Sequence, residues 1–184
     1  MDYFLVRNMN KIEIRQVTIT DLDQLQKIGR QTFTETFASS NTEENMRKYL
    51  EEGFSATKLI TELKDKNAIF YFARLENKLI GYLKINFGQS QTELQDDKAI
   101  EIERIYVLRE YHGKKVGQIL HDKAVEIARQ IKADYVWLGV WEQNLRAITF
   151  YKKNGFVAFD KHIFKLGNNE QTDILMKLKL KNHE

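Results

Sequence analysis

Apolar residues recur along this chain with two different periods, and each period predicts a different kind of element. Alternating polar and apolar residues predict strands, whereas apolar residues spaced by three and four predict amphipathic helices. Strand-length stretches cover Lys11–Val17, Ala68–Leu75, Lys78–Phe87, Ile100–Leu108, Tyr135–Trp141, Phe156–Leu166 and Gln171–Leu180. Short turns at Glu76-Asn77 and Gly167-Asn168-Asn169 separate two neighbouring pairs of these strands, which predicts two hairpins.

Helical spacing occupies most of the intervals between the strands. A first helix follows a polar residue that can cap it, either Thr20 or Asp21. Further helices are predicted in two pieces between residues 41 and 64, at Val116–Ile131 and at Asn144–Asn154. The last of these ends at Gly155, where a glycine readily adopts the left-handed conformation that terminates a helix.

This order of elements predicts one mixed α/β domain over residues 1–184. A composition with 42% hydrophobic and 30% charged residues is ordinary for a globular domain of 184 residues. The longest apolar runs are too short for a membrane helix, and the first residues, MDYFLVRNMNK, lack a signal-peptide cleavage site. We therefore expect a cytoplasmic protein that does not bind a membrane.

Charge and cysteine content exclude several classes of function. Lysine and arginine number 29 against 26 acidic residues, so the net charge of +3 does not indicate nucleic-acid binding. The absence of cysteine excludes disulfides, thiolate metal sites and a cysteine nucleophile. The four histidines (His112, His121, His162 and His183) show no metal-ligand spacing, and we predict no metal site.

The polar turn before the helix at Val116 is a candidate anion-binding element. It reads His112-Gly113-Lys114-Lys115-Val116-Gly117. The first turn of a helix presents unpaired N–H groups and the positive end of the helix dipole, and glycines let a ligand approach the backbone. An ordinary strand-to-helix turn also uses glycine, so both interpretations remain open at this point.

This turn and the segment after Trp141 resemble the GCN5-related N-acetyltransferase (GNAT) family. In the family's loop pattern, Q/R-x-x-G-x-G/A, His112 and Lys115 replace the first two signature residues and Gly117 matches the third. The downstream pattern N-x-x-A-x-x-F-Y-x-x-x-G-F is matched throughout by Asn144, Ala147, Phe150-Tyr151 and Gly155-Phe156. The fragments TFTETF, ENMRKYL, IERIYV, WLGVWEQN, AITFYKKNGF and EQTDILM are similar to PaiA-type polyamine acetyltransferases, from Thr32 to Met176.

The resemblance implies the GNAT fold, a mostly antiparallel mixed sheet of about seven strands flanked by helices. It also implies acetyl transfer from acetyl-CoA to a small-molecule amine, with a polyamine such as spermidine or spermine as the expected acceptor. The main chain of Ile105, Tyr106 and Val107 would hold pantetheine, and His112 to Gly117 would hold the pyrophosphate. Asn144, Ala147 and Tyr151 would complete the cofactor site.

Three residues are candidates for proton transfer. Tyr151 occupies the place of the family's usual general acid, and a phenol can protonate the departing thiolate. Glu101 and Glu103 are two residues apart on a strand and therefore share one face, where either could act as general base, with Glu103 as the first choice. The alternative is that both are solvated or paired with Arg104 or Lys84.

Several aromatic and acidic residues could contribute to the acceptor site, but they do not identify the acceptor. Trp137 and Trp141 share a strand face, which predicts core packing, although Trp141 could also border the acceptor channel. The acidic residues of the N-terminal helices suit either a cationic acceptor or a solvated surface; they are Glu35, Glu43, Glu44, Glu51 and Glu52. A peptide or protein N-acetyltransferase and a non-catalytic CoA-sensing module remain alternatives. The expected oligomeric states are a monomer and a homodimer.

Overall fold

The computed structural model describes residues 12–166 and 169–180 of the chain. The strands are β1 (Ile12–Gln16), β2 (Ala68–Leu75), β3 (Lys78–Phe87), β4 (Ala99–Val107), β5 (Tyr135–Trp141), β6 (Val157–Leu166) and β7 (Asn169–Lys179). The helices are α2 (Leu22–Phe37), α3 (Glu43–Gly53), α4 (Ala56–Lys64), α5 (Val116–Gln130) and α6 (Leu145–Lys153). Predictions on residues 1–11, on the turn residues Gly167 and Asn168, and on His183 lie outside the described residues.

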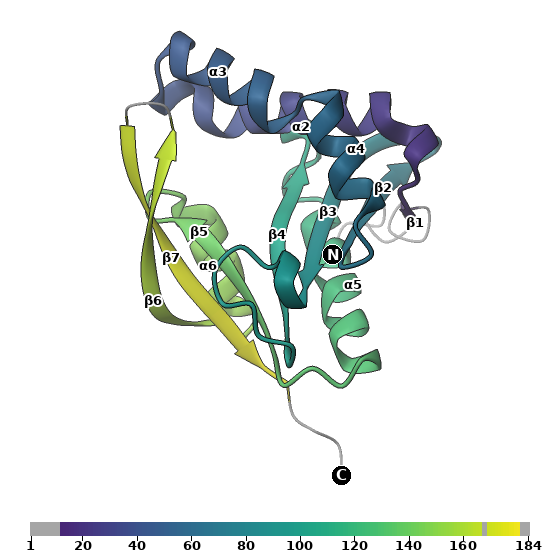
Figure 1. Cartoon of the computed structure of the whole chain (residues 1–184), viewed down its shortest axis with the longest axis vertical. Coiled ribbons are helices and arrows are strands. Elements are labelled where there is room, and N and C mark those ends of the chain that lie inside the picture. The colour runs from purple at the N-terminus through teal and green to yellow at the C-terminus, as the bar shows by residue number, and fades with distance from the viewer. Residues whose placement is uncertain (1–11, 167–168, 181–184) are drawn as a thin grey trace.

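The seven strands form one mixed sheet in the order β1-β2-β3-β4-β5-β7-β6. Neighbours pair antiparallel except for β4 and β5, which are parallel. Helices α2, α3 and α4 form a layer along the top of Figure 1, whereas α5 lies below them beside β3 and β4. The predicted fold class, a mostly antiparallel mixed sheet flanked by helices, is confirmed.

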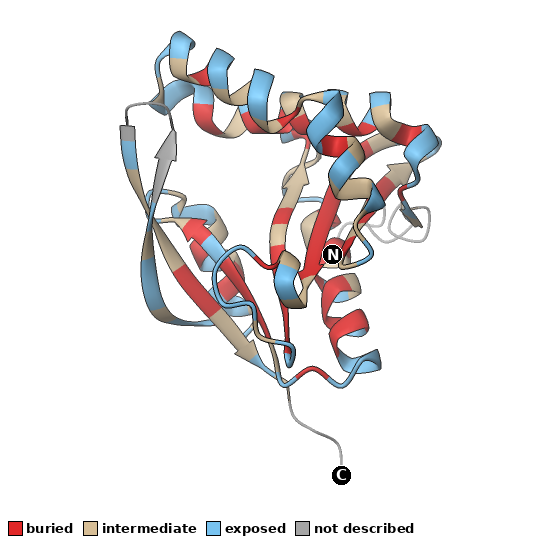
Figure 2. Ribbon diagram, in the orientation of Figure 1, coloured by how far each residue is buried: buried red, intermediate tan, exposed pale blue. Residues whose placement is uncertain are grey.

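The sheet separates two hydrophobic layers, which Figure 2 shows as buried residues along β3, β5 and the inner side of α5. The layer beneath α5 and α6 includes Ile80, Leu120 and Val136, all fully buried. The layer beneath α2 and α4 includes Leu25, Leu59 and Phe72. Each such side chain contributes about 1.5–3 kcal/mol on burial, so the two layers fix the sheet between the helices.

Local conformations explain several element ends. Glu76 and Asn77 both have positive φ, 49° and 67°, as expected for the tight turn of a β-hairpin. Gly155 follows Asn154, the C-cap of α6, and its φ of 86° confirms the predicted left-handed position.

Asp21 occupies the predicted N-cap position of α2, but its side chain makes no capping hydrogen bond to that helix. A short 3₁₀ turn, Ile19–Asp21, precedes α2, and the Asp21 carboxylate accepts a hydrogen bond from Thr18 N at 2.9 Å instead of capping α2. The same carboxylate pairs with Arg15 at 2.8 Å. Two ordered partners therefore hold it away from the helix start, which propensity alone could not reveal.

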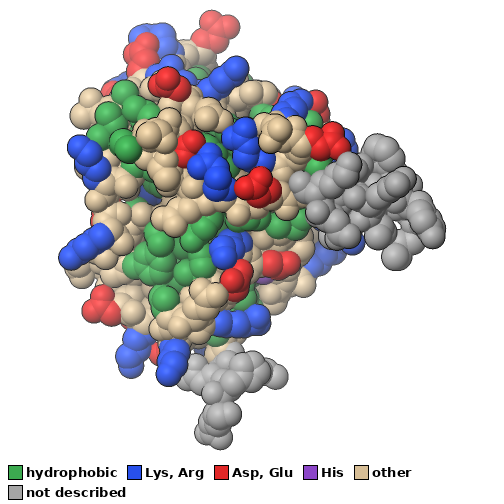
Figure 3. Space-filling view, turned by 90° about the vertical axis from the view of Figure 1, so that its right-hand side faces the viewer, with side chains coloured by type: hydrophobic (Ala, Val, Ile, Leu, Met, Phe, Trp, Pro, Cys, Tyr) green, Lys and Arg blue, Asp and Glu red, His purple; other side chains and the backbone are tan. Residues whose placement is uncertain are grey.

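The molecular surface carries no dominant charge on the face that Figure 3 displays. Basic and acidic side chains are interspersed there around a patch of hydrophobic side chains. Of the helices in the described part of the chain, none is long and apolar enough to span a membrane.

Candidate active site

Strands β4 and β5 separate after a short stretch of parallel pairing. They pair only over Ala99–Glu101 and Tyr135–Trp137, and then diverge toward the α2–α3 layer (Figure 1). Beyond this point, within the described residues, β4 pairs only with β3 and β5 only with β7. Buried backbone N–H and C=O groups need partners, so these two facing edges suit an extended ligand that carries amides. The predicted pantetheine segment, Ile105 to Val107, lies on the β4 edge.

A β-bulge in β4 determines which side chains face the helices. Lys84 pairs with Arg104 and Ile85 with Ile102, which leaves Glu103 as an extra residue. Arg104 consequently points to the α4 side, where it pairs with Glu62, whereas Ile105 and Val107 pack in the layer beneath α5. The bulge thus concentrates charge on the face covered by α2–α4.

The turn between β4 and α5 leaves room for an anion. Lys115 is the N-cap of α5 and has φ 61°, the left-handed conformation that glycine adopts most readily. A Cβ atom built on Gly113 or Gly117 would meet nothing within 4 Å. Lys114 and Lys115 are exposed, whereas Val116 is buried in the core and can offer only its backbone. Replacement of the signature glycine by Lys115 therefore preserves the backbone shape.

Arg146 of α6 reaches this turn and was not predicted as a site residue. His112 Nε2 donates to the Val107 carbonyl at 2.8 Å, and Arg146 donates to Nδ1 of the same ring. Burial lowers the pKa of His112, and Arg146 lowers it further against the opposing effect of the Val107 carbonyl. A neutral ring beside a guanidinium leaves the positive charge on Arg146, a group that binds phosphate well. The sequence signal that could have identified Arg146 was its position two residues after Asn144, inside the matched family motif.

Helix α6 positions the remaining predicted residues. Asn144 Oδ1 accepts a hydrogen bond from Ala147 N at 3.1 Å, so this pair starts the helix. Tyr151 is buried one turn later, and burial raises its pKa above the usual range. Among the described residues its hydroxyl makes no hydrogen bond. Tyr151 therefore stays protonated at neutral pH. The open turn, its cations and the two unpaired strand edges together fit coenzyme A.

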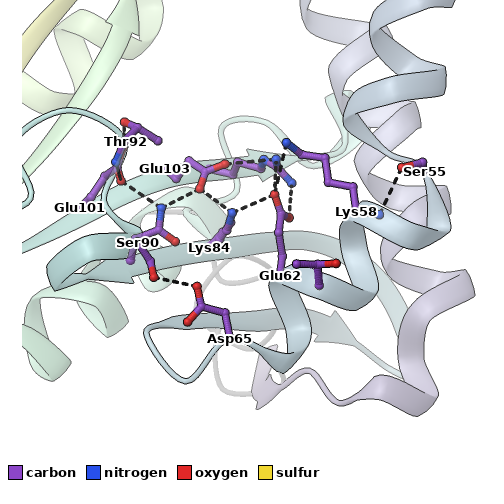
Figure 4. Close-up of polar contacts among 12 residues, drawn as sticks. Ser55, Lys58, Glu62, Asp65, Lys84, Ser90, Thr92, Glu101 and Glu103 are labelled. Carbon is purple, nitrogen blue, oxygen red and sulfur yellow. Dashed lines mark hydrogen bonds and ion pairs between the residues drawn. The ribbon is translucent and has the colours of Figure 1, made fainter.

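Glu103 is an ion-paired residue, as the alternative interpretation of the sequence had it. It contacts Lys84 Nζ at 2.5 Å and Arg104 at 3.1 Å, and it accepts from Asn86 at 2.6 Å (Figure 4). Burial raises its pKa, but Arg104 and Lys84 outweigh burial and lower the pKa to about 2. A carboxylate held so firmly in its ionised form is a weak base.

Glu101 shares the face of Glu103 but is sealed within the protein. It accepts hydrogen bonds from Thr92 N at 2.8 Å, Thr92 Oγ1 at 2.5 Å and Asn86 Nδ2 at 2.9 Å (Figure 4). Burial outweighs these hydrogen bonds, which lower the pKa of Glu101, and raises that pKa above its ordinary value. With both oxygens occupied and 3% of the residue exposed, Glu101 is a structural residue of the loop after β3.

The two tryptophans have different surroundings. Trp137 is 1% exposed and donates to Gln91 at 2.6 Å, so the core-packing prediction is confirmed. Trp141 packs beside Phe37 and borders a cavity of about 530 Å³ at the end of β5. The cavity is lined by Ser40, Trp141, Glu142, Gln143, Glu170, Gln171 and Thr172.

Acidic residues of the N-terminal helices lie mostly on the surface. Four of them are exposed, namely Glu43, Glu44, Glu51 and Glu52, which favours the solvated-face interpretation. Glu35 is half-buried and accepts a hydrogen bond from Arg109 N at 2.8 Å, so it anchors the turn after β4.

Asp173 of β7 is a half-buried carboxylate that was not predicted as a site residue. It lies opposite Trp141 in the sheet, and its Oδ2 would lie 3.5 Å from a Cβ atom built on Gly139. Burial raises its pKa to about 6. Aspartate is disfavoured in strands, so its occurrence just before Ile174-Leu175-Met176 was a usable signal.

Comparison with known proteins decides the family. A model of the acetyltransferase (GNAT) family matches residues 24–156. The chain belongs to the GNAT family of acetyltransferases. It is an N-acetyltransferase that uses acetyl-CoA, so the alternative of a non-catalytic module is wrong.

Three relatives illustrate the similarity of this GNAT enzyme to known proteins. An uncharacterized N-acetyltransferase of Lactobacillus delbrueckii subsp. lactis is 37% identical over 92% of this chain and 98% of that protein. The spermidine N(1)-acetyltransferase of Thermoplasma acidophilum is 30% identical over 81% of this chain and 90% of that protein. The crystal structure of the PaiA N-acetyltransferase from Thermoplasma acidophilum, in complex with coenzyme A, aligns with a TM-score of 0.77 at 28% identity. The alignment covers 92% of this chain and 99% of that one.

Proposed function

We propose that this GNAT enzyme acetylates a polyamine such as spermidine. The observation that carries the proposal is the cavity at the end of β5, whose lining includes Glu142, Glu170 and Trp141. Carboxylates attract ammonium groups, and an aromatic face adds a cation–π contact. A relative named for spermidine acetylation supports the same acceptor class.

Different residues of the chain would bind the cofactor and transfer the proton. Acetyl-CoA supplies an activated acetyl group that an amine can take directly. The β4 edge at Ile105 to Val107 would hold its pantetheine arm. The turn from His112 to Gly117, with Arg146, would hold the pyrophosphate. Tyr151, protonated at neutral pH, would donate a proton to the departing sulfur.

Thiol release from acetyl-CoA tests the acceptor class. Purified protein is incubated with acetyl-CoA and spermidine, spermine or putrescine, and free thiol is measured against amine-free controls. We expect release with at least one polyamine. Efficient release with peptide amino termini and none with any polyamine would instead favour the peptide N-acetyltransferase alternative. A cytoplasmic location and a homodimer stay predictions.

A further inference from the structure

We propose that Asp173 is the carboxylate that receives the ammonium group of the acceptor and removes its proton. Asp173 lies on β7 beside the cavity proposed for the acceptor, on the sheet face that α2–α4 cover. The inference rests on the proposed amine acetyltransferase function and adds the base that this function requires.

The register of the sheet places Asp173 between the cavity and the diverging strands. Its partner in β5 is Trp141, which lines the cavity, and the preceding residue, Thr172, lines it as well. In the other direction it adjoins Gly139, which is exposed even though it lies in the middle of β5. Because Gly139 lacks a side chain, the β5 backbone is open to a ligand beside the Asp173 carboxylate.

The two carboxylates of this face that the sequence offered as bases, Glu101 and Glu103, are already occupied. Glu103 is bound to Lys84 and Arg104, and all of Glu101's hydrogen bonds go to Thr92 and Asn86. Among the described residues, the Asp173 carboxylate has no hydrogen bond and no ion pair. A half-buried carboxylate without a hydrogen bond or ion pair is suited to bind an incoming ammonium group.

The titratable groups around Asp173 come from β6, from α3 and from the loop before β4. His162 of β6 lies opposite it in register, and Glu93, which precedes β4, pairs with His162 at 3.3 Å. Tyr49 of α3 lies within electrostatic reach of Asp173 and of Glu103. Burial raises the pKa of Asp173 to about 6, His162 lowers it and Glu93 raises it. The group is therefore ionised at neutral pH and remains a stronger base than Glu103.

The proton balance closes with Asp173 and Tyr151. The ammonium nitrogen gives one proton to Asp173, and its lone pair then forms a bond to the acetyl carbonyl carbon. The carbon–sulfur bond breaks, and the sulfur takes the Tyr151 hydroxyl proton. The second proton of the nitrogen returns to Tyr151 through solvent, and Asp173 releases its own proton to solvent. The products are the N-acetylated amine, coenzyme A and one proton.

The test compares Asp173→Asn with Asp160→Asn, which makes the same change at an exposed residue of β6. Because Asp173 must be ionised to accept a proton, kcat/KM of the wild type should rise as pH increases through about 6. In Asp173→Asn this rise should disappear and kcat/KM should fall by about 10²–10⁴-fold. Asp160→Asn should retain both, and calorimetry should give unchanged coenzyme A affinity for each variant.

Binding of spermidine to the protein saturated with coenzyme A supplies a readout without turnover. Asp173→Asn should weaken this binding by about tenfold or more, as should lowering the pH to 5 in the wild type. Asp173→Glu retains a carboxylate and should recover part of both effects. If Asp173→Asn does not bind coenzyme A, Asp173→Glu becomes the test, because it keeps a carboxylate. In that case, a kcat/KM of Asp173→Glu that does not rise with pH would contradict the proposal.

Two outcomes separate this proposal from the proposed acceptor. If Asp173→Asn keeps the wild-type pH profile and spermidine affinity, Asp173 is not the base, whatever the acceptor. If the wild type acetylates peptides but no polyamine, the acceptor class is wrong. The same variants then decide the role of Asp173 from the pH profile with the peptide.

Discussion

Gly117 occupies the second position of α5. At this position alanine would stabilise the helix, whereas a bound phosphate would need the space that glycine leaves. The structure leaves the space above its Cα open, so Gly117→Ala introduces no clash. We expect the variant to be more stable by up to about 1 kcal/mol because glycine is a poor helix residue. Its methyl group would nevertheless enter the anion seat and weaken coenzyme A binding by about tenfold. Urea unfolding and calorimetry measure the two effects.

A control substitution at the far end of α5 distinguishes an effect on the anion-binding turn from a general effect of alanine on the helix. Gln130→Ala changes an exposed residue of the last turn of α5 and should leave coenzyme A affinity unchanged. Equal affinity in Gly117→Ala and the wild type would mean that the pyrophosphate does not contact this turn.

Tyr151 offers a second test at the level of one hydroxyl group. Tyr151→Phe keeps the buried ring, whose neighbours are Phe150 and Phe156, and removes only the proton donor. We expect kcat to fall by about 10²-fold or more, with coenzyme A affinity within about twofold of wild type. Steady-state kinetics and calorimetry provide the comparison. Unchanged kcat would show that another group protonates the sulfur.

The bulge of β4 and helix α4 are joined by a buried ionic network. Glu103 and Glu62 share the cations Lys84 and Arg104, and all four side chains are at least four-fifths buried. Glu103→Gln leaves two buried cations with one carboxylate, so we expect a loss of stability of about 3–5 kcal/mol. The exposed pair of Lys78 and Glu110 provides the control, because solvent screens it and Glu110→Gln should change stability far less than Glu103→Gln. Denaturant unfolding measures both variants.

The pH dependence of this network follows from the lowered pKa of Glu103. The folded-state pKa of about 2 lies below the ordinary value of 4.5, so the stabilisation is fully present above 4.5. It is lost as the pH falls toward about 2. The difference in stability between wild type and Glu103→Gln should therefore shrink over this window. A difference that stays constant down to pH 2 would show that Glu103 is not held ionised by its partners.

At the scale of the molecule, sequence patterns predicted the secondary structure and the faces of each element better than the pairing and packing between elements. Alternation gave the strands, and the spacing of two put Glu101 and Glu103 on one face. Periodicity describes a single element, so it could not reveal the bulge at Glu103 or the divergence of β4 and β5, both of which depend on pairing. The approach of Arg146 to His112 and of Asp173 to Gly139 arises from tertiary packing and had only weak local signals.

The divergence of β4 and β5 makes the two halves of the sheet sensitive to the cofactor. In the part of the chain that the structure describes, only three residue pairs join β4 to β5, and the inner edges of both strands beyond these pairs have no strand partner. Coenzyme A that bridges these edges should slow hydrogen exchange in Ile105–Val107 and Leu138–Trp141 together, because ligand binding opposes local opening. The pairing of β1 with β2 lies at the far edge of the sheet and should show no change. Hydrogen–deuterium exchange with mass spectrometry, with and without saturating coenzyme A, measures all three segments. Protection confined to the turn at residues 112–117 would mean that the pantetheine arm does not lie between the strands.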